Sequence, residues 1–219
     1  MTDKFKKQRE QTIAKLIAKT EAELARAGRQ PAGSRTWTSS HGYKFLVQWS
    51  NLVLLRILIR KFTNTLPKSE YRAKAQVDDA ARSSVANVEE GYKRSTTAEY
   101  IRFIGFSQGS LEEVKGDIER FLQDGFLKSV PGSKLSDLGI DLKVWNEWAR
   151  DPINSSKILY FPLKESRGGC RRLEELPASS LTYEIFIELI NKTDYLLRKL
   201  VVSLEQKQDR KKLEIMGIR

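Results

Sequence analysis

The stretch Ala80–Arg94, A-A-R-S-S-V-A-N-V-E-E-G-Y-K-R, is the most informative part of the chain about its fold. It combines many small residues with an Asn-x-x-Glu-Gly sequence and a short basic turn, which predicts a helix that ends at Gly91. A second helix follows, and it carries four more small residues on neighbouring turns, Gly105, Ser107, Gly109 and Ser110. Because small side chains let two helix backbones approach closely, we expect these helices to form the tight centre of a helical bundle.

Apolar residues at helical spacing extend the bundle on the N-terminal side of this stretch. Tyr43–Asn64 is apolar on more than one face, which is typical of a helix that lies centrally or is shared between a core and an oligomer interface. Pro67 lies where the small-residue helix would begin. Further upstream, Phe5–Ala27 predicts an exposed helix with a thin apolar stripe, and Gln30–Gly42 predicts a linker.

The helix after the basic turn has clear start and stop signals. Ser95 or Thr96 can cap it, with Glu99 completing a capping box, and Gly125 ends it. Residues 126–178 are interrupted by Pro and Gly, which predicts a long crossover or an inserted subdomain. One short helix, about Leu142–Ala149, is expected inside it.

The last helix is expected after Pro177, with Ser179 or Ser180 as its cap, and its sequence becomes polar and basic beyond Glu205. The predicted fold is therefore all-α, an up-and-down four-helix bundle with an extra N-terminal helix and a long irregular insertion before the last helix. Its segments are 1–42 (N-terminal helix and linker), 43–125 (bundle helices one to three), 126–178 (inserted crossover or subdomain) and 179–219 (last bundle helix and basic tail).

The chain is basic, and the excess charge is unevenly placed. Lys and Arg number 39 against 28 Asp and Glu, a formal net charge of +11. Residues 31–66 hold five bases and no acid, whereas residues 67–124 hold nine bases and eleven acids; residues 192–219 hold eight bases and four acids. This asymmetry favours a polyanionic partner such as nucleic acid.

Residues for catalysis or metal binding are sparse. His41 is the only histidine and Cys170 the only cysteine, so a Ser-His-Asp triad, a Cys-His pair or a histidine metal site is not expected. The helical carboxylates lack the histidines that a di-iron bundle site requires. We therefore predict no enzyme, no metal and no cofactor. A single cysteine and a charged N-terminus without a signal peptide favour the cytoplasm, and no segment is apolar enough to span a membrane.

Basic residues are the best functional candidates, because phosphate contacts give affinity without sequence readout. A solvated face is the plain alternative for each of them. The predicted nucleic-acid-binding residues are Arg56, Arg60, Lys61, Lys93, Arg94, Arg167, Arg171, Arg172, Arg198, Lys199, Lys207, Arg210, Lys211 and Lys212.

Glu90 is a separate structural candidate. A carboxylate near the C-terminus of a helix is unfavourable with the helix dipole, so it needs a specific cationic partner. We expect that partner to be an Arg or Lys from a neighbouring helix or subunit.

Several motifs resemble the signature of the bacterial four-helix-bundle proteins. This family includes the proteins encoded in rRNA intervening sequences and the accessory variability determinant of diversity-generating retroelements; a longer variant, the four-helix-bundle suffix proteins, is similar at both ends. The resemblance covers about Tyr43–Gly125 and, more loosely, Leu181–Leu204. The matching residues are Leu66-Pro67-x-x-Glu70-Tyr71, Gln76, Ala80-Ala81-x-Ser83, Asn87-Val88-x-Glu90-Gly91, Arg94-Ser95, Glu99-Tyr100 and Gly109-Ser110-Leu111-Glu112-Glu113.

The resemblance implies a small, basic helical protein that forms a pentameric barrel. It also implies, by likeness to the accessory determinant, that the protein binds nucleic acid and a reverse transcriptase. Trp49 is a further interface candidate, and the resemblance places Asn87, Glu90, Gly91 and Ser110 at structural positions of the bundle. The chain departs from the family at Asp78-Asp79, where basic residues are usual, and at Ser84, where an aliphatic residue is usual.

Together these observations predict a non-enzymatic, homo-oligomeric protein that binds nucleic acid, RNA rather than DNA, and assists a reverse transcriptase. The alternative is a scaffold that binds a protein partner through its N-terminal helix and inserted loop, without nucleic acid. The two differ in salt dependence, because only phosphate contacts release counterions when they form.

Overall fold

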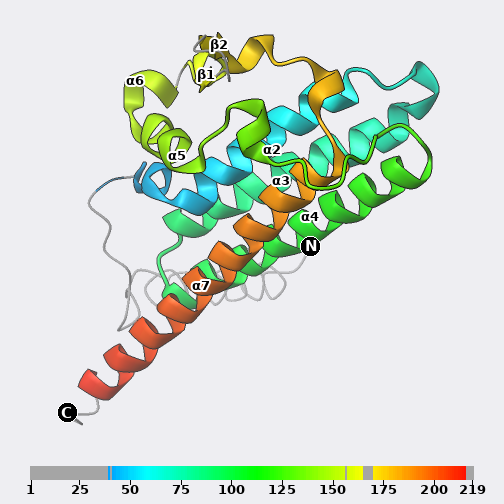
Figure 1. The fold of residues 1–219 in the computed structure, drawn as a ribbon. Helices are drawn as coiled ribbons and strands as arrows, with labels where there is room; N and C mark the ends of the chain where they lie inside the picture. Colours follow the sequence, from blue (N-terminus) through cyan, green and yellow to red (C-terminus); the bar gives the residue numbers. More distant parts are fainter. Residues whose placement is uncertain (1–38, 40, 156, 165–169, 216–219) are drawn as a thin grey trace, which may run out of the picture. The chain divides into compact units, whose positions relative to one another are not determined.

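Four long helices form the bundle in the computed structural model, which describes residue 39 and residues 41–155, 157–164 and 170–215. They are α2 (Val47–Thr63), α3 (Tyr71–Lys93), α4 (Thr97–Gln123) and α7 (Tyr183–Ile215). Successive helices run in opposite directions, and α7 packs against both α4 and α2 to close the bundle (Figure 1). The predicted all-α bundle is therefore confirmed, while the predicted helix Phe5–Ala27 lies outside the described residues.

The first bundle helix is shorter than the sequence predicts. Gly42–Phe45 forms a separate 3₁₀ turn, and Leu46 is extended (φ −80°, ψ 123°), so α2 begins only at Val47. Most of the apolar residues of α2 that the sequence assigned to more than one face are buried within this chain, whereas Val53 and Ile57 are partly exposed. Leu54, Leu55 and Leu58 have no exposed surface at all.

α3 and α4 pack most closely, as the small residues predict, but the individual glycines behave differently. α3 does not end at Gly91; it continues to Lys93, and Arg94 is its C-cap. Ser84 is fully buried, and its carbonyl accepts a hydrogen bond from the Ser107 hydroxyl (2.7 Å). Gly105 and Gly109, in contrast, face open space.

Both ends of α4 follow the sequence prediction. Thr96 caps the helix: its hydroxyl accepts the Glu99 N–H (3.1 Å) and donates to the Glu99 carboxylate (2.8 Å). At the other end Gly125 adopts φ +77°, and the N–H groups of Gly125 and Phe126 donate to the carbonyls of Leu122 and Phe121. This is the Schellman arrangement that favours glycine, since φ is positive there.

The segment between α4 and α7 is folded and lies over α2. It contains α5 (Leu142–Arg150), α6 (Pro152–Ser155) and a small antiparallel hairpin of β1 (Pro162–Lys164) with β2 (Cys170–Arg172), together with short 3₁₀ turns at Leu135–Leu138, Ile158–Tyr160, Leu173–Glu175 and Ala178–Ser180. The sequence predicted α5 but not the three-residue strands. We call residues 126–182 the crossover.

The Trp145 side chain anchors the crossover on the bundle and also packs within the crossover itself. Trp145 is fully buried, and its indole N–H donates to the Ser50 carbonyl of α2 (2.8 Å). Its ring meets that of Phe161 edge to face, with centroids 5.1 Å apart. The crossover thus covers a side of α2 that α3, α4 and α7 leave open (Figure 1).

α7 differs from the prediction at its start, and it extends through the polar and basic residues at its end. Ser179 and Ser180 lie in a 3₁₀ turn, so they do not cap α7; the Thr182 hydroxyl accepts the Ile185 N–H instead (3.5 Å). The helix continues well past Glu205, to Ile215. Its last turns extend beyond the neighbouring ends of α3 and α4 (Figure 1).

Candidate nucleic-acid interface

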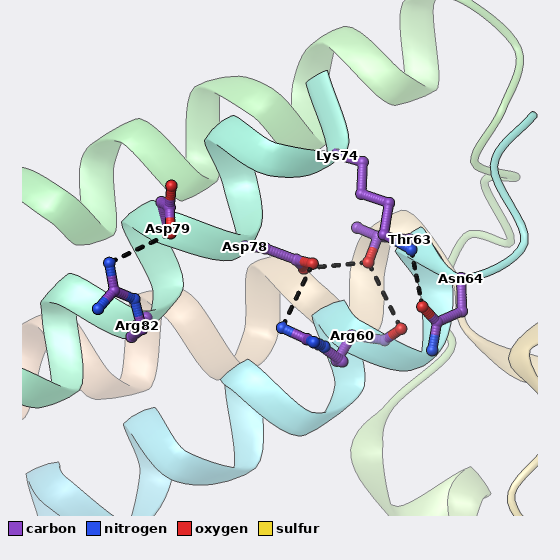
Figure 2. Close-up of polar contacts among 7 residues, drawn as sticks. All are labelled: Arg60, Thr63, Asn64, Lys74, Asp78, Asp79 and Arg82. Atoms are coloured by element: carbon purple, nitrogen blue, oxygen red, sulfur yellow. Dashed lines mark hydrogen bonds and ion pairs between the residues drawn. The ribbon is translucent and has the colours of Figure 1, made fainter. Parts of the chain in front are cut away.

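The predicted basic stripe of α2 is partly neutralised by α3. Arg56 and Arg60 are both exposed on one side of the helix, but the Arg60 guanidinium lies 3.7 Å from the Asp78 carboxylate (Figure 2). Asp78 also accepts a hydrogen bond from the Thr63 hydroxyl (3.0 Å). Arg56 has no ion pair within the part of the chain that the structure describes. Asp78, which stands where the family usually has a basic residue, therefore neutralises the charge of Arg60 and leaves that of Arg56.

Asp79 has a local partner as well. Its carboxylate lies 3.3 Å from the guanidinium of Arg82, one turn later on α3 (Figure 2). Both side chains are exposed, so this pair contributes little to stability. Its consequence is electrostatic: the outer surface of α3 next to α2 is close to neutral, and it is a poor site for phosphate.

Lys61 stabilises the packing of the crossover on α2. Its ammonium donates to the carbonyls of Glu174 (2.7 Å) and Leu176 (3.3 Å), which ties the crossover to the end of α2. Partial burial lowers the pKa of Lys61, and the Glu174 carboxylate opposes that shift. Because its hydrogen bonds are used internally, Lys61 is a weaker candidate for phosphate contact than an exposed lysine.

The basic turn after α3 is occupied by contacts within the chain. Arg94 forms an ion pair with Glu90, and its guanidinium lies 4.5 Å from the ring centroid of Phe103. The cationic partner of Glu90 thus comes from the same helix and not from a neighbouring helix or subunit. Lys93 lies 5.6 Å from the ring of Tyr43. Burial, followed by the charge of Glu89, raises the pKa of the Tyr43 hydroxyl.

The hairpin of the crossover places its cations near an exposed ring. Arg172 pairs with Glu174 (3.3 Å), and its guanidinium lies 5.0 Å from the ring centroid of Tyr160. Arg171 is partly buried. Arg167 lies outside the described residues.

The C-terminal half of α7 carries the densest group of exposed cations. Arg198 pairs with Asp194 (2.6 Å), and Lys212 pairs with Asp209 (3.1 Å). Three others, on the last turns, are exposed and form no ion pair with any residue that the structure describes: Lys207, Arg210 and Lys211. We call Lys207, Arg210, Lys211 and Lys212 the basic end of α7. Residues 207–212 hold these four cations and one acid, Asp209, which is a local excess of positive charge.

The predicted structural residues fall into two groups. Trp49 and Gly91 are buried, and the Trp49 indole N–H donates to the Glu89 carboxylate (2.8 Å). Asn87 and Ser110 are partly exposed, and Glu90 is exposed. Phe106 is also exposed on α4, and its ring packs edge to face on that of Phe103 (centroids 5.6 Å apart). Helical spacing therefore places Asn87 and Glu90 on one partly exposed side of α3, and Phe106 and Ser110 on one of α4.

Sequence reasoning missed the exposed aromatic side chains that lie next to cations. Tyr195 on α7 is largely exposed, and the Lys199 ammonium lies 5.6 Å from its ring centroid. The same arrangement occurs at Tyr71 with Arg72 and at Phe106 with Arg102. An aromatic residue one to four positions from a basic residue on a helix is the signal that could have found them. Of these three rings, only that of Tyr195 lies on α7, the helix that carries the basic end, and an aromatic ring can stack on an unpaired nucleic-acid base.

Other kinds of site find no support. Within the described ranges, no group of three or more His, Cys, Asp or Glu side chains is placed to hold a metal ion. Among the same residues, the helices are too short or too polar to cross a bilayer.

Comparison with known proteins gives a family match. No curated protein and no solved structure matches the chain. A family model does match: residues 44–145 fit the family described as 23S rRNA-intervening sequence protein. The matched segment contains α2, α3 and α4 and ends within α5, so it includes the helix pair around Ala80–Arg94. The resemblance to the family of rRNA intervening-sequence proteins is therefore confirmed over residues 44–145.

Proposed function

We propose that this protein binds RNA without catalysing a reaction, and that the basic end of α7 is its main phosphate-binding surface. The observation that supports this most is the concentration of exposed cations on the last turns of α7, three of them without an ion pair among the described residues. The matched family takes its name from rRNA intervening sequences, which is compatible with an RNA-associated role.

The position of these cations supports the proposal. Elsewhere in the described chain the predicted basic residues are largely engaged, by Asp78, Glu90, Glu174 and Asp194 or by backbone carbonyls. At the basic end of α7 the helix extends past its neighbours, so its side chains can approach a phosphate backbone from several sides (Figure 1). Arg56 is the second candidate contact.

The wider proposal has three further parts. Two rest on the resemblance: the protein acts as a homo-oligomer, for which the resemblance suggests a pentamer, and it assists a reverse transcriptase of a diversity-generating retroelement. The third is that it works in the cytoplasm, which its single cysteine favours. A reverse-transcriptase gene adjacent to the gene for this protein would support the second part.

The scaffold alternative also has an observation in its favour. The crossover exposes apolar side chains at Ile153, Leu159 and Tyr160, which a protein partner could cover. A scaffold that uses this surface would bind its partner with little dependence on salt, which separates the two functions.

The test is the salt dependence of RNA binding. Neutralising the basic end (Lys207→Gln, Arg210→Gln, Lys211→Gln and Lys212→Gln together) removes four phosphate contacts. For a single strand, we expect the slope of log K against log salt to become shallower by about 3, at roughly 0.7 per phosphate. Fluorescence anisotropy with a single-stranded RNA at several salt concentrations measures that slope.

A variant with the same charge change elsewhere is the matched control. Lys68→Gln, Arg82→Gln, Lys115→Gln and Lys143→Gln together lower the net charge by the same amount but scatter the change over other elements. This variant should keep most of the wild-type slope. Equal slopes in the two variants would show that net charge, and not the basic end of α7, determines binding.

A further inference from the structure

A cavity between α2, α5 and α7 has the features of a site for a nucleobase. Its volume is about 420 Å³, within the range of about 300–1,000 Å³ typical of small-ligand sites. Val47, Leu142 and Leu196 supply an apolar wall, and Tyr195 stands at its edge with 59% of its surface exposed. The flat face of a base is the kind of surface that such a wall and ring accept.

Polar groups in the cavity wall are amides, which suit the edge of a base. Asn51, Asn146 and Asn191 all line the cavity. Asn51 is 1% exposed, and its Oδ1 is buried without a hydrogen-bond partner among the described residues. A buried acceptor without a donor costs free energy. A ligand that donates to Oδ1 recovers that amount once the Asn51 amide turns toward the cavity, because in the unliganded fold this atom is covered. The amino groups of adenine, cytosine and guanine are such donors.

Cations next to the cavity suit the phosphate that accompanies a base. Lys192 lines this cavity and also a second one of about 640 Å³, where Lys134 and Lys164 lie. The two acidic residues there are engaged with the backbone: Asp141 accepts the Lys143 N–H (2.8 Å) and Glu188 accepts the Leu135 N–H (2.8 Å). Glu188 also pairs with Lys192, whereas Lys134 and Lys164 have no ion pair in the described part of the chain.

We propose that this cavity takes one unpaired base of the RNA strand. Tyr195 stacks on the base, Asn51 accepts a hydrogen bond from its amino group, and the lysines of the adjoining cavity hold the flanking phosphate. The inference rests on the proposed RNA binding and adds that the bound RNA is single-stranded at this point. Duplex RNA keeps its bases stacked and cannot fill the cavity.

Tyr71 provides a matched control for Tyr195. Tyr71 is 61% exposed, close to the 59% of Tyr195, and a cation lies 5.7 Å from its ring against 5.6 Å for Tyr195. Tyr71 does not line this cavity. Replacing either exposed ring by alanine should leave the fold intact.

The experiment measures binding of a 12-nucleotide single-stranded RNA, with 2-aminopurine at one central position, and of a blunt duplex of the same length. Tyr195→Ala should weaken single-strand binding about 5- to 150-fold, the equivalent of one base–aromatic stack of about 1–3 kcal/mol. Tyr71→Ala should leave it unchanged. The 2-aminopurine fluorescence should change on binding to the wild type and not to Tyr195→Ala, and duplex affinity should be the same for all three proteins.

Asn51→Leu supplies a second, independent readout. It removes a buried acceptor without a partner, so the free energy of unfolding should stay equal or rise, while single-strand affinity should fall about fivefold or more. A residue with only a structural role would lower stability and binding together.

The outcomes separate the two proposals. If single-strand binding depends steeply on salt but Tyr195→Ala and Tyr71→Ala bind equally well, the cavity does not hold a base and the RNA-binding proposal stands. If the wild type binds neither RNA in dilute buffer, the proposed function fails and the base site fails with it.

Discussion

Two glycines in adjacent helices, Gly91 and Gly105, lie in opposite environments. Gly91 is buried in α3, where an added Cβ would lie 2.6 Å from the Cβ of Phe103 and 2.9 Å from the Tyr100 ring. Gly105 in α4 meets nothing within 4 Å. Glycine in a helix interior costs about 0.5–1 kcal/mol relative to alanine. At Gly91 the close approach of α4 offsets that cost. At Gly105 no contact within the described chain offsets it.

Alanine substitution should therefore change stability in opposite directions at these positions. We expect Gly91→Ala to lower the free energy of unfolding by about 1–3 kcal/mol, because the added methyl group overpacks the α3–α4 interface. Gly105→Ala should raise it by about 0.5–1 kcal/mol through helix propensity. Urea denaturation followed by circular dichroism measures both. A stabilised Gly91→Ala would contradict the packing argument.

The sequence alone could predict the close pairing of these helices but not which glycines take part. The density of small residues around Ala80–Arg94 favours close approach, and α3 and α4 do pack closely. Which small residues lie inside depends on the rotation of each helix about its axis, and that follows from tertiary packing. Glycine is the residue type that most often ends a helix, yet α3 continues for two residues past Gly91, where the Tyr100 and Phe103 side chains pack closely against it.

At the level of the element, helix ends with side-chain caps were the most predictable features. The Thr96–Glu99 capping box involves residues three apart, so it can be read from local sequence. The start of α7 was not predictable in the same way. Ser179, Ser180 and Thr182 all have capping side chains, and the packing of Leu181 and Ile185 in the core selects the last of them.

The α4 capping box should make stability depend on pH. The hydrogen bond from the Thr96 hydroxyl lowers the pKa of Glu99 below its ordinary value of 4.5. A carboxyl whose pKa is lower in the folded state stabilises the fold above the unfolded pKa, and this contribution is lost as the pH falls through the folded value. Loss of a threonine N-cap typically costs about 1 kcal/mol, which is the effect expected for Thr96→Ala at pH 7. The difference from wild type should narrow as the pH falls through the folded pKa of Glu99, which lies below 4.5.

Thr97→Ala is the control for this measurement. Thr97 is the first residue of α4, and its hydroxyl takes no part in the capping box. Its effect on the free energy of unfolding should be small and should not change between pH 7 and pH 3. A constant difference between wild type and Thr96→Ala over the same range would show that Glu99 is not stabilised by this hydroxyl.

At the level of the whole molecule, the crossover explains the apolar excess of α2. The sequence offered two explanations for a helix that is apolar on several sides, a central position or an oligomer interface. Much of the excess is buried in one chain, because α5 packs on the side of α2 that the other long helices leave open. Proline and glycine indicated an insertion in residues 126–178, but where that insertion lies depends on contacts far apart in sequence, such as Trp145 with Ser50.

Because most of the apolar surface of α2 is buried within one chain, the proposed self-association needs another surface. The outer side of α3 and α4 is the best candidate. Phe106 is 47% exposed there, on the same helix face as the predicted interface residue Ser110. We expect light scattering on a sizing column to give a multiple of the 25.2 kDa chain mass at micromolar concentration, and Phe106→Ser to reduce it. Phe45→Ser, which removes an equally large exposed ring next to α2, should not. A wild-type monomer would exclude self-association. Loss of assembly in Phe45→Ser alone would show that the interface lies on the α2 side, because burial of the Phe45 ring would then provide the driving force.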